Sequence, residues 1–270
     1  MNNNLANAAL FLIKNFYNFI HFHNVKILLK KYFENYNELK ENGVTIIPNY
    51  LSEIQTKEIR DTFDFALINH NEFVQTTEYN KDLRIFGIEK INKIANDFLN
   101  DDCLIDLIKK YENYLNIVEK TTLGARIQYK IGTLGSGGGW HRDRTFYKYR
   151  YTKAMIYLND VGDNNGPFQY LVGSHRLKNI IKLNYKYNIR YSTKEFANDL
   201  IDKMVASKDL EIKTCACKKG DVIIFDGTGI HRGKPLEEGQ RYAITNYYRF
   251  DPQEILPYKN LNSIKIKIDN

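Results

Sequence analysis

The chain of 270 residues is long enough for one domain with a sizeable core and extensions, and its apolar content of 43% is typical of globular proteins. Its formal net charge is +7, but the lysines are spread along the chain without a nucleic-acid-binding signature, so we expect no specific nucleic-acid binding. Three cysteines, an odd and low number, favour a reducing compartment, and we expect a cytoplasmic protein.

Residues 1–40 are predicted to form an N-terminal helical extension. Apolar side chains recur near one helical face at Leu5, Leu12, Phe16 and Phe19, so we expect two helices or one bent helix. Packing on the core or on a second subunit is the favoured role, and a peripheral membrane contact stays open because lysines accompany the aromatic residues. No apolar run reaches the roughly 18 residues of a membrane span, and no signal peptide is recognised.

The main domain is predicted to span residues 41–270. A short strand at 43–48 leads to a helix whose start is marked by Ser52 and Gln55, which together fit a capping box. Residues 90–118 then show the apolar spacing of helices. These helices are expected to flank the strands that follow.

From residue 122 the pattern changes to the period of two that is typical of a strand. Ala125 and Ile127 alternate with Arg126 and Gln128, as in a barrel strand with one face toward a wet pocket. Gln128 is therefore a candidate contact of a co-substrate. A solvent-facing polar face is the alternative, and the pattern favours neither.

A glycine-rich loop at 132–139 precedes the residues that carry the chemistry. It lacks the Lys-Ser/Thr ending of a phosphate-binding loop, so we expect it to let the backbone pass close to a metal. His141 and Asp143 follow it, two residues apart, and such residues point to the same face of an extended strand. An imidazole nitrogen and a carboxylate oxygen can therefore converge on one point.

Two further strands are predicted at 153–161 and 167–172, and a long insertion at 176–213 interrupts the strand pattern. The insertion carries eight Lys or Arg residues beyond Arg176 and a helical piece near 195–205. A long segment between barrel strands is a typical place for a lid or a specificity element. A solvated surface helix is the alternative.

A second histidine follows the apolar run 222–225, which reads as a buried strand. A glycine-punctuated loop leads from this run to His231. Two histidines and one carboxylate, with the other positions open, are the usual ligands of non-haem Fe(II) that must bind a co-substrate and O2. Ten residues later Arg241 lies in a β-branched and aromatic run, and an arginine on a strand beside a metal can bind a carboxylate bidentately.

The ordered set of these motifs resembles the phytanoyl-CoA dioxygenase family of Fe(II)/2-oxoglutarate-dependent oxygenases. The resemblance rests on His141-Arg142-Asp143, on segments 154–161 and 165–176, and on His231 and Arg241, and it covers roughly residues 41 to 250. One departure is Val172, where the family usually has a proline before the glycine of the Gly-Ser-His segment.

The resemblance implies a mainly β fold with flanking helices (α+β), built on a double-stranded β-helix, or cupin-like jelly-roll, core behind the N-terminal helices. It also implies His141, Asp143 and His231 as iron ligands and Arg241 as the partner of the C5 carboxylate of 2-oxoglutarate. Fe(II), 2-oxoglutarate and O2 are the expected cofactor and co-substrates. The expected reaction is hydroxylation of a small molecule, since Asp143 argues against a halogenase, where the carboxylate is absent.

Two functions of other classes stay open. One is a non-catalytic jelly-roll binding protein with a relict metal site, against which the intact ligands argue. The other is a zinc hydrolase with the same three ligands, in which Arg241 would have no obvious role.

The substrate itself is not identified by the sequence. The basic residues of the insertion, with Arg142, Arg144, Lys148 and Arg150, would raise the local concentration of an anionic substrate. This predicts a phosphate, a carboxylate or a carrier-linked sugar or acyl group. The equally weighted alternative is that these residues only solvate the surface, and the sequence does not indicate an oligomeric state.

Overall fold

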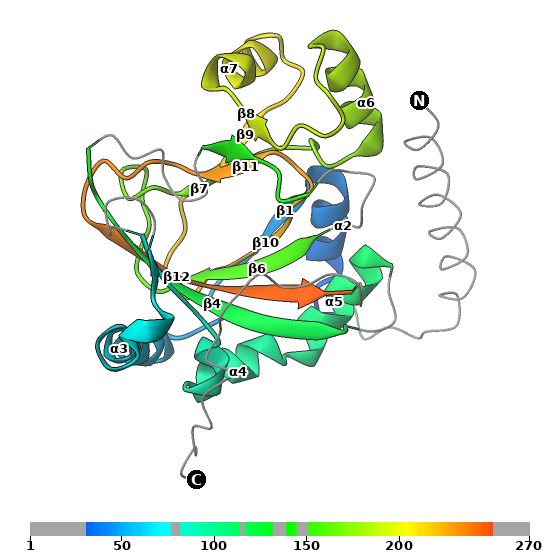
Figure 1. Cartoon of the computed structure of the whole chain (residues 1–270). Helices are drawn as coiled ribbons and strands as arrows, with labels where there is room; N and C mark the ends of the chain where they lie inside the picture. Colours follow the sequence, from blue (N-terminus) through cyan, green and yellow to red (C-terminus); the bar gives the residue numbers. More distant parts are fainter. Residues whose placement is uncertain (1–30, 77–81, 114–116, 132–138, 145–150, 251–270) are drawn as a thin grey trace, which may run out of the picture.

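The computed structural model describes residues 31–76, 82–113, 117–131, 139–144 and 151–250, and within them two antiparallel sheets face each other (Figure 1). The seven-stranded sheet has the order β1 (Val44–Ile47), β10 (Val222–Asp226), β6 (Thr152–Tyr157), β12 (Gln240–Arg249), β4 (Glu119–Gln128), β3 (Asp82–Phe86) and β2 (Gln75–Thr76). The five-stranded sheet has the order β8 (Glu195–Phe196), β5 (Trp140–His141), β11 (His231–Gly233), β7 (Phe168–Leu171) and β9 (Ile212–Cys215). The predicted jelly roll with flanking helices is confirmed.

The inner faces of the two sheets share one apolar core. Phe225 and Ala243 from the seven-stranded sheet pack in the same buried cluster as Phe168 and Tyr170 from the five-stranded sheet. Cys215 also lies in this cluster and, like the other two cysteines, it is a free thiol. This core fills one part of the space between the sheets and leaves the ends of β5 and β11 to carry the polar site.

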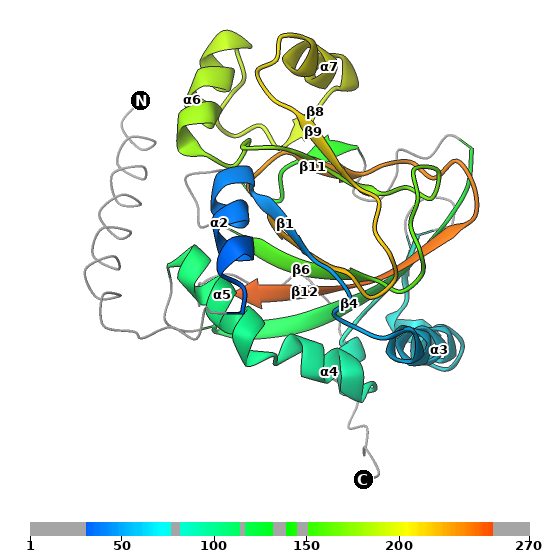
Figure 2. The same ribbon diagram turned by 180° about the vertical axis from the view of Figure 1, so that it is seen from behind.

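Four helices pack on the outer face of the seven-stranded sheet, as the two opposite views show (Figures 1 and 2). They are α2 (Phe33–Asn42), α3 (Glu53–Asn69), α4 (Lys93–Leu99) and α5 (Asp102–Glu112), with the short 3-10 turns η2 (Asn71–Phe73) and η4 (Ile88–Lys90) between them. Helix α3 begins at the predicted capping box, in which the Ser52 side chain accepts from Gln55 N and the Gln55 side chain accepts from Ser52 N. None of the helices in these described ranges has the length and apolar character needed to span a membrane.

The insertion folds onto the outer face of the five-stranded sheet. It contains α6 (Leu177–Lys186), β8 and α7 (Asn198–Ala206). Leu183 of α6 and Met204 of α7 are fully buried against Trp140 and Ile230, two side chains on the outward side of the strands that carry the histidines. The helices of the insertion therefore support the sheet from outside. Only β8 reaches the edge of β5, where Glu195 pairs with His141 and Phe196 with Trp140.

The polar face of β4 lies on the side of α3, not toward a wet pocket as predicted. Arg126 reaches Asp64 of α3 at 3.1 Å, and the apolar residue Ile127 points to the inner side. The reason is that the sheet is covered by helices on its outer face, so an arginine there finds an acidic partner on the helix. Residues 1–30 and the tail 251–270 lie outside the described residues, and so does most of the predicted N-terminal extension. Its last part is described and belongs mainly to α2, which runs across the predicted boundary at residue 40.

Candidate metal centre

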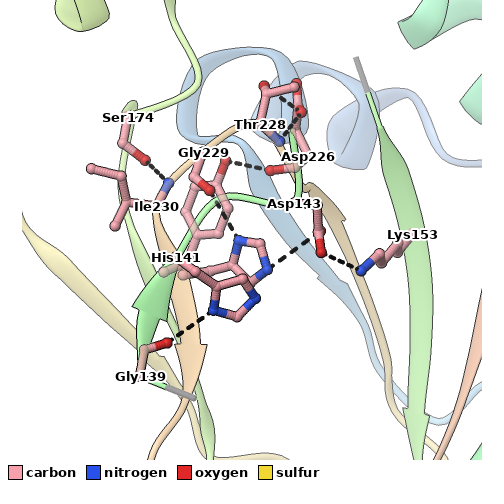
Figure 3. Close-up of polar contacts among 11 residues, drawn as sticks. Gly139, His141, Asp143, Lys153, Ser174, Asp226, Thr228, Gly229 and Ile230 are labelled. Atoms are coloured by element: carbon pink, nitrogen blue, oxygen red, sulfur yellow. Dashed lines mark hydrogen bonds and ion pairs between the residues drawn. The ribbon is translucent and has the colours of Figure 1, made fainter. Parts of the chain in front are cut away.

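His141, Asp143 and His231 meet on the inner side of the five-stranded sheet (Figure 3). Strands β5 and β11 pair antiparallel with His141 directly opposite His231, so both rings lie on one face, and their centroids are 4.4 Å apart. Asp143 follows β5 by two residues and joins them. One ligand atom from each of the three residues lies within 4.8 Å of the others, and in the described part of the chain this is the one His/Cys/Asp/Glu group with metal-binding spacing.

Each histidine ring is oriented by a hydrogen bond to the backbone carbonyl of the residue two positions earlier. Nδ1 of His141 donates to the carbonyl of Gly139 and Nδ1 of His231 to that of Gly229, each at 2.9 Å. Since a carbonyl only accepts, Nε2 of each ring keeps its lone pair for a metal. Burial lowers the pKa of His231 to about 3, so this ring is neutral at physiological pH and ready to bind a cation.

The two carboxylate oxygens of Asp143 have different surroundings. Oδ1 accepts a hydrogen bond from Lys153 Nζ at 2.8 Å, whereas Oδ2 is buried, lacks a hydrogen-bond partner in the described ranges and lies 3.5 Å from His231 Nε2. Burial acts to raise the pKa of Asp143, but Lys153 and the two histidines act against it, and the pKa lies below its ordinary value. An anionic oxygen facing two imidazole nitrogens fits a divalent transition metal such as Fe(II).

The loop before His231 is held in place by Asp226. The Asp226 carboxylate accepts from Thr228 N at 2.9 Å and from Tyr111 Oη at 2.7 Å. The carbonyl of Gly227 then accepts from Asp143 N at 2.8 Å. A Cβ at Gly227 would overlap Asp143 Oδ2, so the glycine lets the carboxylate lie against the loop.

Arg241 lies on β12 opposite Ile127 of β4, on the inner side of the seven-stranded sheet. It is buried, and its guanidinium donates to the carbonyl of Gly166. Burial lowers its pKa, and among the described residues no carboxylate lies within ion-pair distance of it. The nearby Asp82 is bound by Arg84 instead, through contacts of 2.9 and 2.6 Å. A buried guanidinium with spare donors and no acidic partner fits the carboxylate of a bound ligand.

Gln128 is not brought to this cluster. It pairs with Gln240, one residue before Arg241, and alternation along β12 puts Gln240 and Arg241 on opposite faces. Its side chain is within 3.5 Å of that of Gln240 in an exposed contact. A role for Gln128 as a co-substrate contact remains a prediction.

Lys153 is a site residue that sequence reasoning missed. The sequence predicts it only as the first residue of a strand, whereas its ammonium group is buried beside Asp143. The available signal was a single lysine in a run that is otherwise apolar and buried, since Ala154, Ile156 and Tyr157 are fully buried on β6. A buried lysine is rare unless it is paired.

A family model for phytanoyl-CoA dioxygenase (PhyH) matches residues 39–241 of the sequence. The chain belongs to the phytanoyl-CoA dioxygenase family. It is therefore a member of the Fe(II)/2-oxoglutarate-dependent oxygenases, whose cofactor is iron and whose co-substrates are 2-oxoglutarate and O2. No curated protein matches the sequence significantly.

Solved structures share the fold of this family member at low sequence identity. The carbocyclase SnoK from nogalamycin biosynthesis, which is non-haem and α-ketoglutarate-dependent, is 16% identical with a TM-score of 0.57, over 82% of this chain and 87% of that one. The epimerase SnoN in complex with Fe3+, α-ketoglutarate and nogalamycin RO is 13% identical with a TM-score of 0.56, over 82% and 88%. HygX from Streptomyces hygroscopicus with nickel, 2-oxoglutarate and hygromycin B bound is 16% identical with a TM-score of 0.51, over 80% and 86%.

Proposed function

We propose that the protein hydroxylates a small molecule, with His141, Asp143 and His231 as the iron ligands and Arg241 as the partner of the distal carboxylate of 2-oxoglutarate. The observation that carries this proposal is the buried Asp143 Oδ2, which faces the two histidines without a hydrogen-bond partner among the described residues. Buried polar atoms in folded proteins normally have a partner, and a bound cation would supply one for this oxygen. Family membership gives the class of reaction, and the cluster gives the residues.

Each of these residues has a separate task in the proposed reaction. The two imidazoles and the carboxylate hold the metal on one side and leave its other side open to ligands. Arg241 orients 2-oxoglutarate by a charge-assisted contact in a buried setting, where such contacts are strong. When bound, the iron supplies the activation of O2 with oxidation of 2-oxoglutarate, which provides the oxidant for a C–H bond.

Anaerobic addition of Fe(II) and 2-oxoglutarate tests the assignment. Chelation of Fe(II) by 2-oxoglutarate gives a visible charge-transfer absorption band, which we expect for the wild type and not for His231→Ala. Succinate release on admission of O2 would then exclude a relict binding site. A protein that binds Zn2+ but gives neither band nor succinate would be a hydrolase or a binding protein, and the proposal would be wrong.

For the substrate, we propose a small anionic or carrier-linked molecule bearing phosphate, carboxylate, or a linked sugar or acyl group. The net charge of +7 supports this, as does Arg144, which directly follows Asp143. The lysines of the insertion give less support, because Lys182 and Lys186 are paired with Asp209 on the outward side. Steering predicts that kcat/KM for such a substrate falls steeply with ionic strength, and a flat salt profile would count against it.

For the division of the chain, we propose an N-terminal extension at 1–40 and an oxygenase domain at 41–270 with its insertion at 176–213. A reducing, cytoplasmic location is supported by the free thiols of Cys103, Cys215 and Cys217. Fractionation of cells that make the tagged protein would test the location.

A further inference from the structure

Lys153 is the one cation in direct contact with the candidate metal ligands in the described part of the chain (Figure 3). Its Nζ donates to Asp143 Oδ1 at 2.8 Å. It comes from β6 of the seven-stranded sheet, whereas the ligands belong to the opposite sheet. The contact therefore joins the two sheets of the jelly roll at the candidate centre.

The ammonium group of Lys153 is enclosed by aromatic rings. Nζ lies 4.6 Å from the ring centroid of Tyr247, 5.2 Å from that of Tyr151 and 5.9 Å from that of Phe225. These rings hold the cation by their electron-rich faces and keep water from it. The Asp143 carboxylate is the acidic partner of this buried ammonium group.

The contact divides the two oxygens of Asp143 between two partners. Oδ1 faces the lysine, and Oδ2 faces His231. A carboxylate that binds a metal through both oxygens must turn both toward the ion, which would break the contact with Lys153 and leave a buried ammonium unpaired. Such an unpaired buried charge is strongly destabilising.

We infer that Lys153 is a positioning residue that restricts Asp143 to a single metal bond through Oδ2 and thereby keeps one further coordination position open. The inference rests on the proposed function, since it takes Asp143 as a ligand. An octahedral ion held by three protein atoms has about three positions left, enough for a chelating 2-oxoglutarate and for O2. A carboxylate bound through both oxygens would occupy the position that O2 needs.

Water relaxation by protein-bound Mn(II) measures the open positions without turnover. With Mn(II) at saturation, the water-proton relaxivity of Lys153→Met is expected to fall by about a third relative to wild type, because Asp143 gains a second bond and displaces one of about three waters. Methionine has a similar length and suits the aromatic surroundings. Lys153→Arg keeps a cationic donor, and its relaxivity is expected to stay at the wild-type value.

Lys213→Met is the matched control. Lys213 also forms an ion pair, with Glu38 at 2.5 Å, but it lies on β9 outside the cluster. Its relaxivity is expected to equal that of wild type, and thermal unfolding checks that each variant is folded.

The outcomes separate this inference from the proposed function. Full relaxivity in Lys153→Met, or an equal fall in Lys213→Met or Lys153→Arg, would overturn the role of Lys153 alone. A wild-type protein that fails to bind Mn(II) would overturn the ligand assignment itself.

Discussion

At the scale of single residues, the site depends on close approach between two loops. Gly227 lies where the chain after β5 meets the chain after β10, and its carbonyl binds Asp143 N at 2.8 Å. A methyl group there would overlap Asp143 Oδ2 and lie 2.9 Å from the carbonyl of Tyr151. The backbone of Tyr151 cannot move away as a flexible side chain could, so the carboxylate has to shift.

Gly227→Ala is therefore expected to weaken Mn(II) or Fe(II) binding by roughly 10- to 100-fold, the range found when groups that orient metal ligands are lost. Titration followed by the electron paramagnetic resonance signal of free Mn(II) measures this. Gly162→Ala is the control, because the nearest atom to its new Cβ is Asn165 Oδ1 at 3.7 Å. Equal affinity in the two variants would show that Asp143 tolerates the displacement.

Arg241 and Arg249 lie at opposite ends of β12 and provide a matched pair. Arg249 is bound by Glu119 at 2.8 Å, whereas Arg241 has no carboxylate partner in the described ranges. We expect Arg241→Ala to raise the KM for 2-oxoglutarate by about 10- to 100-fold, or about 1.4–2.7 kcal/mol. Arg249→Ala should leave this KM within about threefold of wild type, and the reverse result would move the carboxylate site to Arg249.

At the scale of elements, the insertion supports the strands that bear the histidines. Leu183 of α6 is buried in the cluster that contains Trp140 and Ile230, and Ile181 on the same helix is 48% exposed. The insertion is thus part of the core, and its loss should destabilise β5 and β11.

Leu183→Ala is expected to lower the free energy of unfolding by about 2–5 kcal/mol through lost burial and a cavity. For a chain of this size the melting temperature would fall by roughly 4–10 °C. Ile181→Ala should change stability by less than about 0.5 kcal/mol. Calorimetry of both variants decides the point, and equal melting temperatures would mean that α6 is not anchored through Leu183.

The sequence predicted most helices and strands correctly, but it did not predict which face of each element would be exposed. The capping box at Ser52 and Gln55 predicts the start of α3 because it depends only on residues three apart. The alternation in β4 predicts a strand, but the side that faces the barrel depends on α3, which lies about 60 residues earlier. Arg126 forms a hydrogen bond with Asp64 on that helix, so the polar face of β4 is covered by a helix instead of lining a pocket.

At the scale of the whole molecule, a metal should stabilise the fold, because the three candidate ligands meet only in the folded chain. At a free metal concentration of about 100 times Kd, binding adds about 2.7 kcal/mol to the free energy of unfolding. This corresponds to a rise in melting temperature of roughly 5 °C.

Differential scanning calorimetry with Ni2+, Mn2+ or a chelator measures this shift. His231→Ala is expected to lose it, because one of the three ligand atoms is gone. A shift of the same size in that variant would place the metal elsewhere.

The sequence by itself determined the family, the jelly-roll class and the candidates His141, Asp143, His231 and Arg241. It could do so because family motifs keep their order along the chain, and because a histidine and a carboxylate two residues apart stay close even though Asp143 lies just after β5. These are local properties, and they survive without knowledge of the packing.

The tertiary structure alone decided which residues surround that set. Lys153 reaches Asp143 because β6 and β5 lie on opposite sheets that close over the core. Gln128 lies away from the set because it pairs with Gln240, whose side chain is on the face of β12 opposite to that of Arg241. The helices of the insertion support the outer face of the five-stranded sheet for the same reason. Their buried side chains pack against Trp140 of β5 and Ile230, the residue before β11. Each sheet has two faces, and different segments of the chain pack on each face. Alternation along one strand shows which side chains share a face, but it does not show which distant segment will cover that face.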